Sequence, residues 1–267
     1  MEPGLARDAL TLLLGFTTGV LSALFGIGGA IVSNPGLRAL GAAPLVAVGT
    51  TLPSILPGAI SGTLRYRREG LVNWQLIIPA AASGLLAVVA GSLLSHAVPG
   101  GGHLLLLLIA VLLAFTAWRT AVAPSATPAP DAAEDVAATP DRRTRWLAAG
   151  IGVVAGLLSG LLGIGGGVIM VPAFTELLGM SLKSAIATSL VCVGIFGVPA
   201  TITHAFLGDI DWRLAVLLTI GVIPGARIGA SLTIRTAERR LRLAVGIFLA
   251  LVALVYFVTE TRALLAL

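Results

Sequence analysis

Two clusters of glycine are the residues of this sequence best suited to binding a solute. Each cluster lies inside a long apolar segment and is followed by a proline. Their members are Gly26, Gly28 and Gly29 in the first cluster and Gly163, Gly165, Gly166 and Gly167 in the second. Glycine costs about 1 kcal/mol in a helix interior, so both segments should break there. Amides released from helical bonding would donate to an anion. Close helix packing through small residues is the alternative.

Four hydroxyl side chains follow the clusters, early in the next apolar segment. They are Thr50, Thr51, Thr188 and Ser189. Their positions would let them complete a polar pocket beside the glycines, as hydrogen-bond donors. Hydroxyls in apolar helices also bond the carbonyl groups of their own helix, which would make them structural.

Three ionisable side chains could take part in binding or coupling. Arg227 lies within an apolar segment, where its guanidinium would match the oxygens of an oxyanion, and snorkelling to a nearby interface is the alternative. His204 could relay protons, because imidazole titrates near neutral pH, and Glu176 could carry a coupling proton. Each of these two could instead lie at a solvated or interfacial helix end. Cys192 is expected to be a small buried apolar residue.

The motifs also exclude several classes of chemistry. The G-x-G-G string lacks the third spaced glycine and the later acidic residue of a nucleotide fingerprint, and no Walker sequence is present. The sequence contains no G-x-S-x-G element, no metal-spaced group of His or Cys, and no pair of intramembrane carboxylates. We therefore expect neither an enzyme nor a bound cofactor or metal.

Composition indicates that the chain lies in a membrane. Of its 267 residues, 57% are apolar and 11% charged, with a mean hydropathy of +1.02, whereas soluble domains are about 25% charged. Apolar runs of about 20 residues, the length that crosses a bilayer core, recur along the chain. The net charge of +5 comes from Arg residues in the short loops between these runs, so nucleic acid is not an expected partner. The expected fold class is an all-α, polytopic helical membrane protein.

An internal repeat divides the chain into two homologous halves. Residues 19–35 align with 156–172 at a constant offset of 137, and after one inserted residue Trp74 aligns with Trp212 at an offset of 138. A segment rich in Pro, Ala and acidic residues separates the halves, and its composition is typical of a solvated linker. The predicted domains are residues 1–120, a cytoplasmic linker at 121–145, and residues 146–267.

The first element of each half is too long for one straight crossing. At about 33 residues, a single helix would measure roughly 50 Å, beyond the bilayer core. Matching interruptions in two halves are the best sequence pointer to a transporter's binding site. The expected helices are 9–40 and 146–178, each interrupted, with 45–64, 74–95, 104–121, 184–206, 212–234 and 241–258.

Loop charges predict that the two halves have opposite orientations. In the first half the loop after the second element carries Arg65, Arg67 and Arg68, whereas in the second half the Arg-rich loop comes one element later, at 235–242. Because Lys and Arg favour the cytoplasmic side, the halves would be inverted repeats in which each interrupted element is a re-entrant hairpin. Parallel repeats with four full crossings per half are the alternative.

These residues make the chain similar to the sulfite exporter TauE/SafE family of membrane permeases. The resemblance rests on the repeated G-x-G-G signature, on Ala187-Thr188-Ser189, on Gly208-x-x-Asp211-Trp212 and on Pro224-Gly225-Ala226. The first half departs from the pattern, with Asn34 before the proline and Gly-Thr-Thr at 49–51. The resemblance implies a multi-pass bacterial inner-membrane transporter, whose relatives are linked to sulfite, sulfonates and other organosulfur or small organic anions.

The sequence therefore predicts a secondary transporter of a small anion. The two breaks would meet near mid-membrane, and one half would rock against the other. Expected partners are the anionic solute, membrane lipid and a coupling proton. An anion channel would share the breaks and lack coupling, and a membrane-embedded enzyme is disfavoured by the missing motifs.

Overall fold

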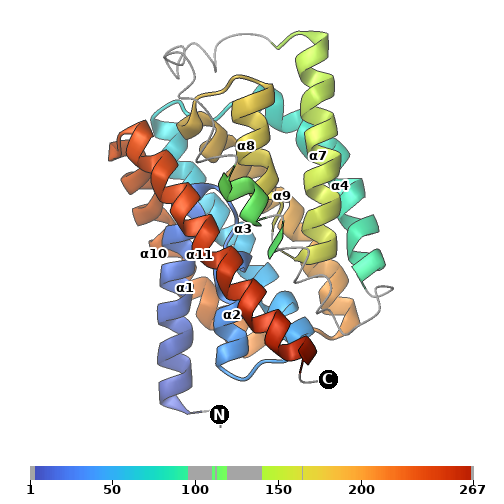
Figure 1. The fold of residues 1–267 in the computed structure, drawn as a ribbon, viewed down its shortest axis with the longest axis vertical. Helices are drawn as coiled ribbons and strands as arrows, with labels where there is room; N and C mark the ends of the chain where they lie inside the picture. Colours follow the sequence, from blue (N-terminus) through green and yellow to red (C-terminus); the bar gives the residue numbers. More distant parts are fainter. Residues whose placement is uncertain (1–3, 96–109, 112, 119–139, 164, 266–267) are drawn as a thin grey trace.

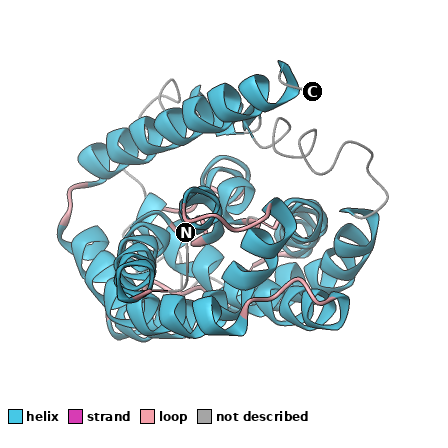
Figure 2. Cartoon of the chain, turned by 90° about the horizontal axis from the view of Figure 1, so that it is seen from below, coloured by secondary structure: helices cyan, strands magenta, loops and turns pink. Residues whose placement is uncertain are grey.

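The structure, a computed structural model, is built from helices (Figures 1 and 2). It describes residues 4–95, 110–111, 113–118, 140–163 and 165–265, and this part of the chain contains no strand. Seven of the described helices are long and apolar enough to cross a membrane, which confirms the all-α polytopic class. The helices are α1 (Leu5–Phe25), α2 (Ala30–Ala39), α3 (Pro44–Arg68), α4 (Trp74–Ser95), α7 (Arg142–Leu162), α8 (Gly167–Leu177), α9 (Leu182–Leu207), α10 (Trp212–Arg235) and α11 (Glu238–Leu265).

The first element of each half breaks where the glycines lie, as predicted. Gly26 and Gly163 follow the last residues of α1 and α7 with φ of 67° and 64°, a conformation that other residues rarely adopt. The chain then folds back on α1. The contacts show this, since a Cβ at Gly29 would meet Thr18 and one at Gly36 would meet Leu14. The later residue, Gly36, thus contacts the earlier residue of α1, Leu14, so α2 runs antiparallel to α1. The first interrupted element is therefore a hairpin.

Helices α3 and α9, which occupy equivalent places in the two halves, run antiparallel. Leu56 of α3 touches Gly194 of α9, and these two residues are equivalent at the offset of 138. On one side of this crossing Leu52 lies near Gly197, and on the other side Gly62 meets Leu190. Figure 1 agrees, since α1 rises from the N-terminus whereas α7 descends from the opposite end. This geometry supports the inverted arrangement of the repeats.

The closest helix pairs join one half to the other. Glycines of α1 and α10 face the partner's backbone, as do glycines of α4 and α7. They are Gly15, Gly19, Gly221, Gly225 and Gly229 in the first pair and Gly84, Gly91, Gly152, Gly156 and Gly160 in the second. Residue numbers rise together along both pairs, so the paired helices are parallel. Small residues here permit the close backbone approach that stabilises helix pairs in membranes.

Basic residues gather at one end of the molecule. The end of α3, the start of α7, and the turn between α10 and α11 lie at this end, opposite the N-terminus in Figure 1. It carries Arg65, Arg67, Arg68, Arg142, Arg143, Arg145, Arg235, Arg239, Arg240 and Arg242. The positive-inside rule predicts that this end faces the cytoplasm. Membrane sidedness, and with it the cytoplasmic linker, stays a prediction. Most of that linker, 121–139, lies outside the described residues.

Helix α11 crosses one side of the bundle and covers the first hairpin (Figures 1 and 2). Phe248 of α11 stacks on Phe25 at the end of α1, with ring centroids 4.7 Å apart. The Tyr256 hydroxyl lies 3.4 Å from the carbonyl oxygen of Ile31. That carbonyl lacks its usual helical partner because Pro35 has no N–H group. Helix α11 thus shields the hairpin and supplies a missing hydrogen bond.

Candidate functional site

The two glycine breaks lie against each other in the interior. Gly167, at the start of α8, packs on the carbonyl oxygen of Gly26 and on Ile27, leaving no room for a Cβ. A Cβ at Gly165 would lie 3.6 Å from the Cα of Gly28. All the glycines of both clusters are buried. The structure thus brings together two clusters that are 137 residues apart in sequence.

Amide groups at the breaks have hydrogen-bonding capacity to spare. Among the described residues, the N–H groups of Gly28, Gly29, Gly165 and Gly166 donate no hydrogen bond. Helices α2 and α8 begin at these positions, and the start of a helix carries a partial positive charge. Buried amides without acceptors are rare in proteins. The site is therefore suited to a solute that presents acceptor atoms and negative charge.

Two of the four predicted hydroxyls lie next to the first hairpin. Ser189 donates a hydrogen bond of 3.0 Å to the carbonyl oxygen of Gly26, which joins α9 to the break. Thr51 Oγ1 lies 3.0 Å from Asn34 Oδ1 and also bonds Ala47 in its own helix. Both hydroxyls are fully buried. Ser189 thus fixes the break, and Thr51 belongs to a polar group on α2 and α3.

The other two hydroxyls hold the starts of helices. Thr50 Oγ1 accepts a hydrogen bond of 2.9 Å from the N–H of Asp211, and Thr188 Oγ1 accepts one of 3.1 Å from the N–H of Asn73. Asp211 and Asn73 in turn accept from the first turns of α10 and α4. The two sets of contacts are equivalent in the repeat. The geometry gives Thr50 and Thr188 a positioning role at the starts of α10 and α4.

The predicted ionisable residues do not meet at the breaks. Arg227 and Glu176 are exposed, Arg227 on the outer face of α10 and Glu176 in the last turn of α8. The Arg227 guanidinium therefore does not line the breaks, and its outward position fits snorkelling. His204 is buried, with Nδ1 2.9 Å from Asp209 Oδ2. It lies near the end of α9, whereas the breaks contact the first half of that helix, between Ile186 and Val193.

Comparison with known proteins decides the class of this arrangement. Residues 11–256 match the family described as Sulfite exporter TauE/SafE. The chain belongs to this family. It is therefore a multi-pass membrane transporter and not an enzyme.

Relatives of this TauE/SafE protein carry names of the same kind. A "Probable membrane transporter protein" of Xylella fastidiosa is 29% identical over 84% of this chain and 82% of its own length. The "Probable membrane transporter protein YunE" of Bacillus subtilis is 26% identical over 91% and 94% of the two chains. YjnA of the same organism, with the same description, is 28% identical over 86% and 92%. No solved structure matches.

One polar residue of this transporter was missed as a site candidate. Asn34 lies on α2, with 1% of its surface exposed, and its Nδ2 has no hydrogen-bond partner. The sequence does contain a signal for it. An amide side chain within an apolar membrane segment is costly and marks a functional site by default, and the second half has Val171 at this position.

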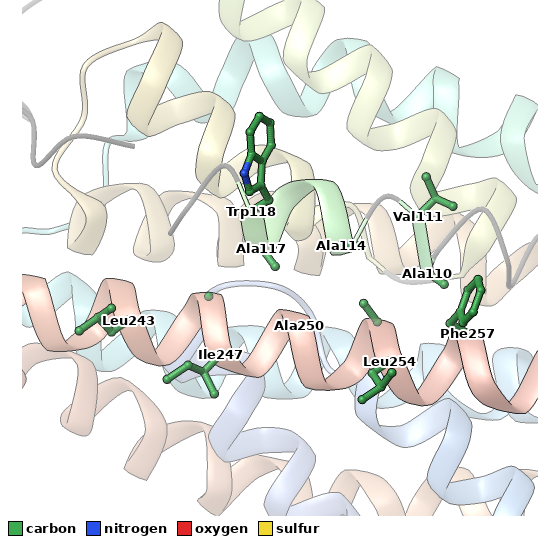
Figure 3. A pocket seen from close by; sticks show the side chains of 12 residues that line it. Ala110, Val111, Ala114, Ala117, Trp118, Leu243, Ile247, Ala250, Leu254 and Phe257 are labelled. Atoms are coloured by element: carbon green, nitrogen blue, oxygen red, sulfur yellow. The ribbon is translucent and has the colours of Figure 1, made fainter. Parts of the chain in front are cut away.

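A groove on the outside of the transporter is distinct from the glycine site. It has a volume of about 700 Å³ and lies between α11 and the described part of 110–118. Figure 3 shows its side chains, with Trp118 and Phe257 toward opposite ends and alanines between them. The lining is apolar, so the groove offers nothing to an anion. The candidate solute site remains the packed interior around the two breaks.

Proposed function

We propose that this TauE/SafE protein is a secondary carrier of a small anion across the bacterial inner membrane. The anion is sulfite, a sulfonate or a related organosulfur or organic anion. The observation that carries the proposal is the meeting of the two breaks, with Gly28, Gly29, Gly165 and Gly166 holding amides that donate no hydrogen bond in the described part. Helix starts that face one another attract negative charge.

A carrier accounts for the burial of this site better than a pore does. All the glycines at the breaks are buried, and Gly167 packs on Gly26 without space for a Cβ. A solute can reach these amides only if the packed elements separate. Separation toward one side at a time is the alternating access of a carrier.

Two bodies built from both halves are the moving parts in this proposal. The first body contains α1, α3 and α10, which share hydrogen bonds. Its contacts are Tyr66 to Ala23, Ser61 to Ile223, and Thr233 to Leu24. The second contains the equivalent helices α7, α9 and α4, with Ser83 bonded to Ala149. This partition replaces the rocking of one sequence half against the other, because the glycine-packed pairs α1/α10 and α4/α7 each cross the halves.

The surface between the bodies is suited to movement. Where α3 crosses α9, small and aliphatic residues meet, such as Ala59 with Gly194 and Ile55 with Gly197. Apolar contacts of this kind are non-directional and can slide. The hairpins α1/α2 and α7/α8 place one break on each body. Movement at this crossing would therefore open the space between the breaks.

Proton coupling is part of the same proposal. His204 pairs with Asp209 close to Asp211, whose N–H is bonded to Thr50 of α3. A change in the charge of the buried His204 would alter how the end of α9 packs on the start of α3 and α10. Glu176, exposed on α8, is the second candidate for a coupling group.

Transport by the purified protein in liposomes tests the proposed function. We expect uptake of labelled sulfite, or of taurine, thiosulfate or sulfoacetate. Gly28→Leu and Gly165→Leu should abolish uptake, because both positions have positive φ of 86° and 85° and lie where the two breaks meet. Gly150→Leu is the matched control, since its Cβ would meet nothing within 4 Å. If no small anion is taken up by the unaltered protein, the proposal fails.

A further inference from the structure

A group of buried polar side chains surrounds the start of α2, and the glycine amides do not account for it. It consists of Thr18 on α1, Ser33 and Asn34 on α2, and Thr51 on α3, here called the hairpin polar cluster. Their exposed fractions are 1%, 0%, 1% and 0%. Ser33 Oγ lies 3.0 Å from Thr51 Oγ1 and 3.1 Å from the carbonyl oxygen of Gly29. The methyl group of Thr18 lies against the same glycine.

Two atoms of the hairpin polar cluster are buried without a hydrogen-bond partner. They are Asn34 Nδ2 and Thr18 Oγ1. Turning over the Asn34 amide would pair Nδ2 with Thr51 and leave Oδ1 unpaired, so one end of the amide lacks a partner in either orientation. Unpaired buried polar groups are rare because they are costly. A partner is therefore expected when the site is in use.

The fold itself does not require these polar residues. At the repeat offset of 137, Thr18 corresponds to Ala155 and Asn34 to Val171. The second half builds its equivalent hairpin, α7 and α8, with these apolar residues. If packing of the hairpin required polar side chains at these positions, both halves would carry them. The polarity of the first hairpin is thus an addition that one half carries alone.

Resting on the proposed carrier function, we propose that the hairpin polar cluster selects the solute by its oxygen atoms. The Asn34 amide and the Thr18 hydroxyl donate hydrogen bonds to two oxygens of an oxyanion, whose charge lies toward the amides at the start of α2. Donors that reach separate oxygen atoms favour sulfonate-like or carboxylate groups over a monatomic anion. The positive end of α2 would repel a cation.

Variants that copy the second half test this selection. Asn34→Val and Thr18→Ala each install the residue found at the equivalent position. Loss of one hydrogen bond to a charged group should raise the KM for sulfite in liposomes on the order of tenfold. Asn34→Asp should weaken binding further, because it places a carboxylate beside the anion. Thr17→Ala is the matched control, since Thr17 is exposed and bonds only its own helix.

Binding without transport is measured in parallel, on the same proteins in detergent. The readout is the rise in the midpoint of thermal unfolding caused by sulfite, methanesulfonate, acetate or chloride, each as sodium and as choline salt. We expect the three oxyanions to stabilise the unaltered protein more than chloride does. Asn34→Val and Thr18→Ala should reduce that stabilisation, and Thr17→Ala should retain it. Thr18→Ala decides the question if Asn34→Val does not fold.

The two proposals fail in different ways. If the unaltered protein transports sulfite and Asn34→Val keeps its KM and its anion-dependent stabilisation, the cluster is structural and this inference is overturned, while the carrier function stands. If nothing is transported but oxyanions stabilise the protein through Asn34, the cluster is an anion site and the carrier function fails. If sodium salts stabilise the protein and choline salts of the same anions do not, the cluster binds a cation. That result also overturns this inference.

Discussion

At the scale of single residues, Thr50 and Thr188 show that hydroxyls expected to line a site can hold the starts of distant helices. The sequence predicted both as solute ligands, from their position after the glycine clusters. In the structure each accepts from the N–H of a helix-capping residue, at 2.9 Å and 3.1 Å. Those partners lie 161 and 115 residues away in the chain. Local spacing could identify these hydroxyls as important and could not reveal what they bond.

Removing either hydroxyl should destabilise the transporter. Thr50→Val and Thr188→Val keep the side-chain shape and leave a helix-capping N–H unpaired, a loss of about 1–3 kcal/mol in the free energy of unfolding. We expect a lower midpoint of thermal unfolding in detergent for both variants. Thr17→Val, at an exposed hydroxyl, should keep the original midpoint. Equal midpoints for all three variants would mean that the two contacts do not stabilise the fold.

His204 supports a second prediction at this scale. If its pairing with Asp209, at 2.9 Å, serves proton coupling, an inward proton gradient should speed solute uptake by the unaltered protein. His204→Gln should then take up solute at a rate independent of the gradient, because the amide does not titrate. Uptake into liposomes with imposed pH differences measures this. A gradient dependence that survives in His204→Gln would exclude His204 as the coupling group.

At the scale of elements, the sequence predicted where the chain breaks and not how the breaks pack. Glycine clusters after 21-residue helices are enough to place the ends of α1 and α7, since the propensity cost is local. The contact of Gly167 with Gly26, and the cover that α11 lays over Phe25, depend on long-range packing. For the same reason Asn34 appeared as a departure from a motif and not as part of a buried cluster.

Cysteine cross-links distinguish elements that move from elements that stay together. The pair Ile55→Cys/Gly197→Cys joins α3 to α9, between the proposed bodies, and Ala23→Cys/Gly62→Cys joins α1 to α3, within one body. The Cβ separation is 3.3 Å at both sites, close to the roughly 3.8 Å of a disulfide. A Cys192→Ala background removes the buried native thiol. Oxidation should stop sulfite uptake in the first pair and spare it in the second.

The controls for this experiment are the same proteins after reduction. Reducing agent should restore uptake to the Ile55→Cys/Gly197→Cys protein, which excludes damage by the substitutions themselves. Free uptake with the α3/α9 cross-link fully formed would show that this crossing does not move. Loss of uptake only in the Ala23→Cys/Gly62→Cys protein would reverse the assignment of the bodies.

At the scale of the whole molecule, charge and symmetry agree. Loop charges in the sequence predicted inverted halves, and the antiparallel crossing of α3 and α9 at the equivalent residues Leu56 and Gly194 supports that prediction. The Arg-rich segments 65–68, 142–145 and 235–242 share one end of the structure. Composition could fix the membrane class, and the internal repeat could fix the number of halves. Neither could show that the most closely packed helix pairs, α1/α10 and α4/α7, each combine one helix from each half.

Membrane orientation can be measured with reporter fusions. A reporter inserted at Ala237, in the turn between α10 and α11, should give a cytoplasmic signal, as should one in the linker at 121–139. A reporter at Gly208, between α9 and α10, should give the opposite signal. Signals from opposite sides of the membrane at Ala237 and the linker would defeat the inverted arrangement and favour parallel repeats.

The most direct test of the account is counterflow of labelled solute in liposomes that contain the purified protein. The central claim is that the two breaks form one solute site that is exposed to one side at a time. Vesicles preloaded with unlabelled sulfite should then accumulate labelled sulfite transiently above its equilibrium level, because exchange through a carrier is faster than net flux. Gly165→Leu should abolish the overshoot and Gly150→Leu should preserve it. Labelled sulfite that only approaches equilibrium, unaffected by sulfite inside, would contradict the account.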